Sequence, residues 1–257
     1  MSRFYSIIVI TVFILTGLVL APLSDPLKYF LVIAVLVALL TILAIGAAWI
    51  RSQLYVRTIC KGKPDRNMIA ITFDDGPDPR NTPEILKILQ KYDAKASFFI
   101  IGKKAEGNES LVLDIYNAGH TVGNHSYAHS NLFPVHSVNR ISEEIEKTTH
   151  ILEGITSNKV KYFRPPFGVT NPRIHRGLRG SGLKVIGWNR RSLDTSIRNP
   201  DSVVQRISKR LKAGDIILLH DTSDHIADIL EQILNISKQK GLNCVSLDTL
   251  LKNKHIR

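Results

Sequence analysis

The sequence predicts a parallel α/β domain, with a sheet that is either open or closed into a barrel, preceded by a hairpin of two transmembrane helices. Three observations lead to this prediction. Residues 1–50 are almost uncharged, seven short apolar runs recur between residues 67 and 250, and helical patterns separate these runs. Strands that alternate with helices in this way are typical of parallel sheets.

Two long apolar segments account for the predicted hairpin. The first 50 residues carry only three charges, which are Arg3, Asp25 and Lys28. Between these charges lie residues 4–24 and 29–50, and each stretch is long enough to cross about 30 Å of hydrocarbon as a helix. We therefore expect two membrane-spanning helices, joined by a tight turn and in contact with the lipid bilayer.

A cleaved signal peptide is the alternative interpretation of residues 4–24. The segment is long and rich in leucine for such a peptide, and Pro22 directly after Ala21 is a poor cleavage context. These features favour a retained two-pass anchor over a peptide that is removed.

The basic residues around the hairpin predict the side of the membrane on which the domain lies. The connecting turn contains only Lys28, whereas six basic residues flank the outer ends of the hairpin: Arg3, Arg51, Arg57, Lys61, Lys63 and Arg66. The positive-inside rule then places both chain ends and the large domain in the cytoplasm, although the rule has less force when a long domain follows.

The rest of the chain is predicted to form a basic juxtamembrane linker at residues 51–66 and one domain at residues 67–257. The composition, 44% hydrophobic and 22% charged, excludes disorder and collagen-like structure. Cys60 and Cys244 allow one disulfide at most, so a disulfide framework and a cysteine-rich zinc site are both excluded. Whether the two cysteines pair is left open.

The domain carries most of the positive charge of the chain. Of the total net charge of +12, +11 lies outside the first 50 residues. This charge favours work close to anionic headgroups or phosphates. The basic residues are dispersed and form no recognised nucleic-acid-binding motif, so no nucleic-acid partner is expected. No protein partner can be inferred.

Seven strands are predicted from the apolar runs, with helices between them. Thr82 and Asn199 are residues typical of helix N-caps, and each precedes a proline suited to the first helical turn. Gly119, Gly214 and Gly241 stand where helices should end. The predicted strands are Met68–Phe73, Ala96–Ile101, Thr121–Gly123, Lys161–Phe163, Lys184–Trp188, Asp215–Leu219 and Asn243–Val245.

Polar side chains that suit catalysis follow five of these strands. In chain order they are Asp74 and Asp75, His125 and His129, Arg164, Asp194, and His220. Each group alone has an ordinary explanation, because Asp-Asp-Gly-Pro is common turn chemistry and a pair of histidines can be solvated loop residues. Active sites of parallel α/β folds lie at the carboxyl ends of the strands, so the joint occurrence predicts a site.

Two histidines and a carboxylate from this group would form a metal site with open positions. His125, His129 and one of the two adjacent aspartates supply imidazole and carboxylate ligands, which suit zinc or a similar divalent ion. The other aspartate could then accept a proton from a water molecule that the metal activates.

Four of these segments resemble the conserved motifs of a known family. Residues 72–77, Thr-Phe-Asp-Asp-Gly-Pro, resemble the first motif of the polysaccharide deacetylases, the NodB-homology family of carbohydrate esterases (carbohydrate esterase family 4). His125-Ser126-x-x-His129 is similar to the second motif, Arg164-x-Pro166-x-Gly168 to the third, and Leu218-x-His220 to the fifth. The resemblance covers about residues 67–250.

This resemblance implies a distorted, seven-stranded (β/α) barrel and metal-dependent removal of acetyl groups from amino sugars. It implies one divalent metal ion, zinc first and cobalt or another divalent ion as alternatives. It also implies roles for the matching residues: Asp74 as general base, Asp75, His125 and His129 as metal ligands, Arg164 as the residue that orients Asp74, the Phe167 N–H as an oxyanion donor, His220 as general acid, and Asp194 as the residue that holds His220.

The sequence departs from the family pattern around the expected substrate groove. Trp188 and Leu218 are expected to contact the substrate. The family commonly has tyrosine where Phe167 stands, but a backbone donor survives that change. In the fourth motif, Asp-x-x-Asp-Trp is replaced by residues 191–195, Arg-Ser-Leu-Asp-Thr, so a tryptophan that would wall the acetyl-binding groove is missing. Ser130 stands where a proline often follows the second histidine. The identity of the sugar therefore stays open.

The expected function is that of a membrane-anchored, metal-dependent deacetylase acting on the N-acetyl group of an amino sugar in a chitin- or peptidoglycan-like polysaccharide. One alternative is an O-acetyl esterase, a deformylase, or a deacetylase of a lipid-linked sugar precursor. Another is an inactive, membrane-tethered binding module. An assembled cell-wall substrate would require the domain outside the cell, in opposition to the prediction from the flanking charges.

Overall fold

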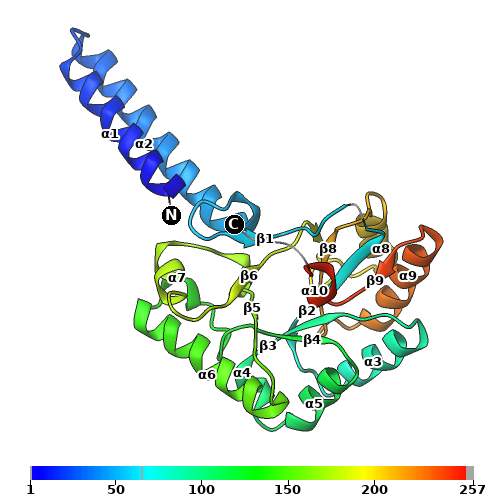
Figure 1. Cartoon of the computed structure of the whole chain (residues 1–257). Coiled ribbons are helices and arrows are strands. Elements are labelled where there is room, and N and C mark those ends of the chain that lie inside the picture. The colour runs from blue at the N-terminus through cyan, green and yellow to red at the C-terminus, as the bar shows by residue number, and fades with distance from the viewer. Residues whose placement is uncertain (1, 65, 253–257) are drawn as a thin grey trace.

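The computed structural model describes residues 2–64 and 66–252, and it shows a long helical hairpin beside an α/β domain (Figure 1). The strands are β1 (Thr58–Ile59), β2 (Met68–Gly76), β3 (Ser97–Ile100), β4 (Thr121–Asn124), β5 (Tyr162–Phe163), β6 (Lys184–Ile186), β7 (Arg190–Arg191), β8 (Ile216–His220) and β9 (Asn243–Cys244). The α-helices are α1 (Ser2–Leu20), α2 (Asp25–Ala48), α3 (Thr82–Lys91), α4 (Gly102–Ala105), α5 (Glu109–Asn117), α6 (Val138–Thr156), α7 (Pro172–Gly177), α8 (Pro200–Ser208), α9 (Ile226–Gln239) and α10 (Leu247–Leu250). Three short 3₁₀ helices complete the fold: η1 (Ile50–Ser52), η2 (Phe133–Val135) and η3 (Pro166–Gly168).

The strands form one curled parallel sheet. Its order is β1-β6-β5-β4-β3-β2-β8-β7, and β9 pairs with the start of β2. The strands β6 and β7 are close together in the chain but lie near opposite ends of the strand order, because β6 pairs with β5 and β7 pairs with β8. The sheet therefore curls into a distorted barrel with helices outside it, and the predicted (β/α) fold class is confirmed.

All seven predicted strands are present among the described residues, together with two that the sequence did not reveal. The additional strands, β1 and β7, contain two residues each. A strand of two residues carries no alternation of apolar and polar side chains, and Arg190–Arg191 is polar throughout. Helix α8 begins at its predicted cap, because the Asn199 side chain accepts a hydrogen bond from Ser202 N–H. In α3 the N-cap position is Asn81, one residue before the predicted Thr82, and its side chain makes no capping hydrogen bond.

The core positions the polar edge of the sheet by fixing the register of the central strands. Phe73 of β2 is buried and its ring stacks on Phe98 of β3 at 5.0 Å. Burial of one such side chain stabilises the fold by about 1.5–3 kcal/mol. In the β2–β8 pair, Asp74 lies opposite His220, one position beyond the buried Phe73–Leu219 pair. The apolar register thus brings the polar ends of these two strands side by side.

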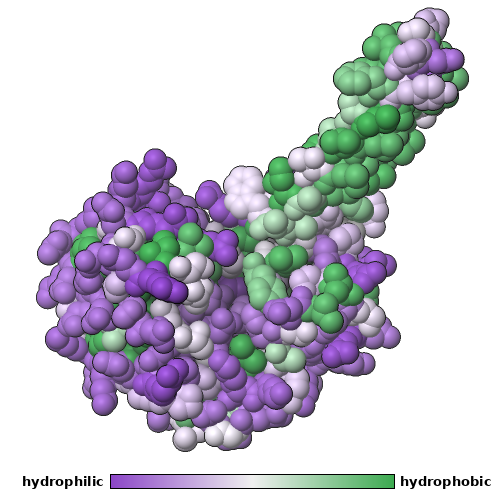
Figure 2. Space-filling model, turned by 180° about the vertical axis from the view of Figure 1, so that it is seen from behind, coloured by the Kyte–Doolittle hydropathy of each residue, from purple (hydrophilic) through white to green (hydrophobic). Residues whose placement is uncertain are grey.

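The hairpin consists of two helices that are long and apolar enough to cross a membrane, by length and composition only. Both begin earlier than predicted, since α1 starts at Ser2 and α2 at Asp25. Charged residues are tolerated in a first helical turn, and Pro26 suits that position. Figure 2 shows that the hairpin surface is almost wholly hydrophobic, whereas the domain surface is mainly hydrophilic.

The hairpin and the domain share a packed joint. Tyr55 is buried; its ring lies 5.4 Å from Phe4 of α1, and its hydroxyl donates to the Leu43 carbonyl of α2 at 3.1 Å. The Thr170 N–H donates to the Ala47 carbonyl at the end of α2 at 3.0 Å. Residues 51–66, for which a linker is predicted, thus include buried side chains and the strand β1.

Candidate active site

The carboxyl ends of the strands surround a pocket of about 290 Å³. Eight of the ten residues predicted for the site line this pocket. The remaining two, Arg164 and Asp194, are buried behind it and contact residues that line it. The lining residues are Asp74, Asp75, His125, His129, Phe167, Gly168, Trp188, Arg191, Leu193, Thr195, Leu218 and His220.

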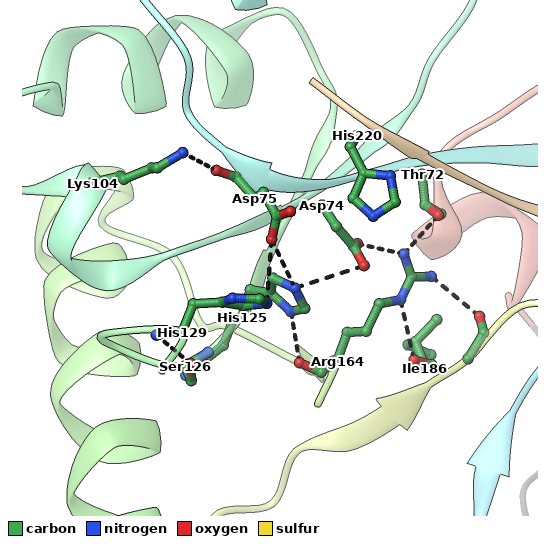
Figure 3. Close-up of polar contacts among 12 residues, drawn as sticks. Thr72, Asp74, Asp75, Lys104, His125, Ser126, His129, Arg164, Ile186 and His220 are labelled. Carbon is green, nitrogen blue, oxygen red and sulfur yellow. Dashed lines mark hydrogen bonds and ion pairs between the residues drawn. The ribbon is translucent and has the colours of Figure 1, made fainter. Parts of the chain in front are cut away.

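Asp75, His125 and His129 form a group that could hold a metal ion. Their nearest ligand atoms all lie within 4.8 Å of one another. Asp75 Oδ1 lies 3.4 Å from His125 Nε2 and 3.3 Å from His129 Nε2 (Figure 3). Among the described residues this buried Oδ1 has no hydrogen-bond donor. An orphaned carboxylate oxygen facing two imidazole nitrogens is the arrangement that a cation would complete, so the residues present fit a divalent metal.

The two histidines are oriented by contacts at their other ends. His125 is buried, and its Nδ1 lies 2.8 Å from the Arg164 carbonyl, an arrangement in which a protonated Nδ1 donates and leaves Nε2 as the ligand atom. The His129 N–H donates to the Ser126 hydroxyl at 3.2 Å, which fixes the turn that carries the second imidazole.

The protonation of this group shows how strongly its members interact. Burial alone would raise the pKa of the Asp75 carboxyl, but the neighbouring imidazoles, His125 first, hold that pKa well below its usual range. Burial, and then the charge of His125, lower the pKa of His129 to about 4. His129 is therefore neutral at pH 7, the form in which an imidazole can bind a metal ion.

Asp74 lies beside this group and is held by a buried arginine. Arg164 Nη1 donates to Asp74 Oδ1 at 2.6 Å and to the Thr72 hydroxyl at 2.8 Å. The other nitrogens of the guanidinium donate to the carbonyls of Ile186 and Gly187. A fully buried guanidinium with four such bonds has one orientation, so it fixes the Asp74 carboxylate, whose Oδ2 lies 3.7 Å from His125 Nε2.

His220 faces the pocket from β8 and is paired with Asp194. Its Nδ1 lies 2.8 Å from Asp194 Oδ1, and its backbone N–H donates to Asp194 Oδ2 at 2.7 Å. Burial would lower the pKa of His220, but the hydrogen bond and charge of Asp194, with the charges of Asp74 and Asp75, raise that pKa to about 9. His220 is therefore protonated at neutral pH, with Nε2–H available to a ligand.

Backbone strain gathers at the same rim. Of eight described non-glycine residues with positive φ, five line the pocket or adjoin it: Asp75, Ser126, His129, Phe167 and Leu193. Such conformations cost about 1–3 kcal/mol each and persist only where the surroundings impose them. Their concentration here indicates that the rim is shaped for a ligand.

One side of the pocket wall is aromatic, and the other side consists of residues that differ from the family pattern. Gly168 has φ +68°, and a Cβ there would lie 2.3 Å from the Trp188 ring, so only glycine allows the ring to close the wall. The Phe167 ring is half exposed and lies 4.8 Å from His129. On the other side, Arg191, Leu193 and Thr195 line the pocket, and these residues belong to the segment that lacks the family's tryptophan.

The structure also identifies supporting residues that the sequence prediction missed. The Thr72 hydroxyl accepts from Arg164, and Lys104 Nζ donates to the Asp75 carbonyl at 2.7 Å (Figure 3). The Ser192 hydroxyl donates to Asp194 Oδ1 at 2.6 Å. Thr72 and Ser192 lie two residues before Asp74 and Asp194, a spacing that could have signalled them. Lys104, on α4, gave no such signal. Cys60 and Cys244 are both free thiols.

Comparisons with known proteins identify relatives of this chain. A family model for polysaccharide deacetylase matches residues 61–186. A curated peptidoglycan-N-acetylglucosamine deacetylase from Bacillus cereus is 35% identical over 201 residues, which cover 74% of this chain and 91% of that protein.

Solved structures show the same similarity. A carbohydrate esterase family 4 (CE4) pseudoenzyme from Bacillus anthracis has a TM-score of 0.71 and 30% identity, covering 76% of this chain and 69% of its own. A mutant of that pseudoenzyme is described as having restored enzymatic activity. The peptidoglycan deacetylase PdaC from Bacillus subtilis has a TM-score of 0.68 and 31% identity, covering 73% and 91% of the two chains.

Proposed function

Because this chain belongs to the polysaccharide deacetylase family, we propose that it is a metal-dependent enzyme that hydrolyses the N-acetyl group of an amino sugar in peptidoglycan. The observation that carries the proposal is the metal-fitting group Asp75, His125 and His129, flanked by the Asp74–Arg164 pair and the His220–Asp194 pair. The pocket thus contains one group that can accept a proton, Asp74, and one group that can donate a proton, His220.

The metal, when bound, would polarise the amide carbonyl and make the attacking water more acidic. Asp74, fixed by Arg164, would accept the proton from that water. The bond between the acetyl carbon and the sugar nitrogen then breaks, and His220 would donate its Nε2 proton to the leaving amine. The products are acetate and the free amino sugar, and the proton taken by Asp74 balances the one given by His220.

Peptidoglycan is proposed as the substrate because relatives from two Bacillus species and from Listeria are named for it. The B. cereus and Listeria monocytogenes relatives are named peptidoglycan-N-acetylglucosamine deacetylases, and one from B. subtilis is named for N-acetylmuramic acid. The B. anthracis relative is a pseudoenzyme. The present chain has the complete set Asp74, Asp75, His125, His129 and His220, which favours an active enzyme over a binding module.

The experiment is an assay of the purified full-length chain for released acetate. The panel is peptidoglycan fragments, chitooligosaccharides and acetylxylan, each with added zinc or cobalt and with Asp74→Asn as the inactive control. Release from peptidoglycan fragments above the control supports the proposal. Release from acetylxylan alone would favour an O-acetyl esterase, and no release from any substrate would favour a binding module.

We further propose that the hairpin anchors the chain in the membrane. The packing of Phe4 on Tyr55 supports retention of α1, because removal of this helix would expose the ring of Tyr55, which is now buried. The flanking charges favour a cytoplasmic domain, which would meet lipid-linked precursors, whereas assembled peptidoglycan requires an external one. Reporters fused after Arg257, one active only inside the cell and one only outside, decide between these two substrates.

A further inference from the structure

We propose that the domain binds an anionic phospholipid in a groove at the foot of the hairpin, away from the catalytic pocket. This inference rests on the membrane anchoring proposed above. The groove has a volume of about 330 Å³, and it lies between β1, β6 and α7. Figure 1 shows these elements on the part of the domain next to the ends of α1 and α2. The groove and the catalytic pocket have no lining residue in common.

The floor of this hairpin groove is apolar and continues into the joint with the hairpin. Val56, Leu178 and Leu183 line the groove. All three belong to, or pack against, the same apolar cluster as Phe4 and Ile7 of α1. A hydrocarbon chain that lies along α1 in the bilayer would therefore meet an apolar surface where it reaches the domain.

The rim of the groove carries positive charge and no carboxylate. Arg57, Arg179 and Lys184 are exposed residues that line it, and His175 lies with them. Among the described residues that line the groove none is acidic, and no described carboxylate lies within ion-pair distance of Arg179 or Lys184. Three cations above an apolar floor match a lipid with a phosphate headgroup and acyl chains. The aliphatic part of each basic side chain can pack along the acyl chains while its charged end contacts the phosphate.

The position along the chain supports a membrane lipid rather than a soluble ligand. Arg57 directly follows Val56, which belongs to the cluster that holds both helices of the hairpin. Arg57 is nine residues beyond the end of α2 at Ala48, so if α2 spans the bilayer the groove would lie near the lipid headgroups. A peptide or a second copy of this chain would instead need a site that is accessible away from the membrane.

The test uses the full chain in nanodiscs of phosphatidylcholine, with or without phosphatidylglycerol, and counts retained lipid by native mass spectrometry. The chain should retain phosphatidylglycerol in preference to phosphatidylcholine. Each basic residue near an anionic surface favours binding by about fivefold. Arg57→Gln, Arg179→Gln and Lys184→Gln together should therefore weaken the preference by at least about tenfold, and Arg179→Glu alone should weaken it more than Arg179→Gln. Acetate release from a soluble substrate should not change.

The matched control removes three charges at the ends of α8 and α9, by Lys209→Gln, Lys238→Gln and Lys240→Gln. An equal loss in this control would mean general attraction to the surface and would overturn the groove, as would equal retention of both lipids by the unchanged chain. Carbonate extraction separates the two proposals. Release of the chain would refute membrane insertion and the groove with it, whereas an inserted chain without lipid preference would refute the groove alone.

Discussion

Both ends of the barrel carry polar clusters, but among the described residues only the cluster at the carboxyl end contains a buried polar atom without a partner. At the amino end, Asp248 accepts hydrogen bonds from Thr121, Lys161 and Tyr162 at 3.0–3.2 Å. At the carboxyl end, Asp75 Oδ1 is buried and lacks a donor among the described residues. The cavities differ likewise, with about 30 Å³ beside Asp248 and about 290 Å³ beside Asp75.

Polar groups with all their partners present stabilise the fold, whereas a buried polar atom without a partner indicates a place for a ligand. The histidines show it as clearly as the aspartates. At the amino end, burial lowers the pKa of His120 to about 4, and its Nδ1 accepts from the Ala96 N–H. At the carboxyl end, His220 has a pKa of about 9 although it is also largely buried, because Asp194 outweighs the burial. Aspartate and histidine thus occur at both ends, and the completeness of their hydrogen-bond partners distinguishes the two clusters.

The largest effect is expected from His125→Ala combined with His129→Ala. The double variant should lose both the metal and all measurable acetate release, because two of the three ligands are gone. Elemental analysis and the acetate assay measure these losses. His120→Ala at the other end should cost about 1–3 kcal/mol of stability, because it leaves the Ala96 N–H unpaired, and should retain the metal. Metal content that survives the double change would refute the assignment.

Asp74→Asn should retain the metal and reduce kcat by about 10²–10⁴-fold. The amide is nearly isosteric with the carboxylate but cannot accept a proton. Asp74 does not belong to the metal-fitting group, so its replacement should leave metal binding intact. Elemental analysis and steady-state kinetics on the same preparation check both halves of this prediction. If the variant kept more than about half of the activity, Asp74 could not be the base.

Asp194→Asn should change the pH dependence. The general acid must be protonated, so activity of the unchanged chain should fall as pH rises through about 9, the pKa of His220. Without the Asp194 charge this pKa should fall towards its ordinary value near 6.5, and activity at pH 8 should drop roughly thirtyfold. The stabilisation from the pair should be complete below about pH 6.5 and lost as pH rises through about 9. A profile of kcat/KM against pH that does not move would refute the role of Asp194.

Asp248→Asn should have the smallest effect. The change weakens the bond to Lys161, which is half exposed, and alters the contacts with Thr121 and Tyr162, so a loss of about 1 kcal/mol in unfolding free energy is expected. Thermal unfolding measures the loss, and kcat should be unchanged. A fall in kcat without a loss of stability would show that the amino end takes part in function.

The sequence predicted the strands that appear as recurring apolar runs, and the polar residues that follow them. Seven apolar runs gave seven strands, and the polar residues after five of them meet at one rim. This succeeded because parallel strands bring their carboxyl ends to one edge, so position along each strand carries spatial information. Roles within the rim stay predictions, since geometry alone does not test them.

The sequence was least informative at residues 51–66. Five basic residues in this stretch predict a solvated linker, yet Leu54, Tyr55 and Val56 are buried and β1 adds a strand to the sheet. Three apolar residues among charges have no period that distinguishes a strand from a loop. Their burial depends on packing against the hairpin and against the apolar cluster that contains Phe163 and Ile174, and these long-range contacts are not encoded in a local pattern.

The joint between the hairpin and the domain has a consequence for which glycans the enzyme can reach. A flexible chain as long as residues 51–66 would let the domain move about 22 Å from its anchor. The bonds Thr170–Ala47 and Tyr55–Leu43 instead mount the domain directly on α2. If the hairpin spans the bilayer, the pocket is held at one height, and deacetylation would fall off with distance from the membrane. If the domain also lies outside the cell, the joint would confine the modification to glycans within one fixed distance of the membrane.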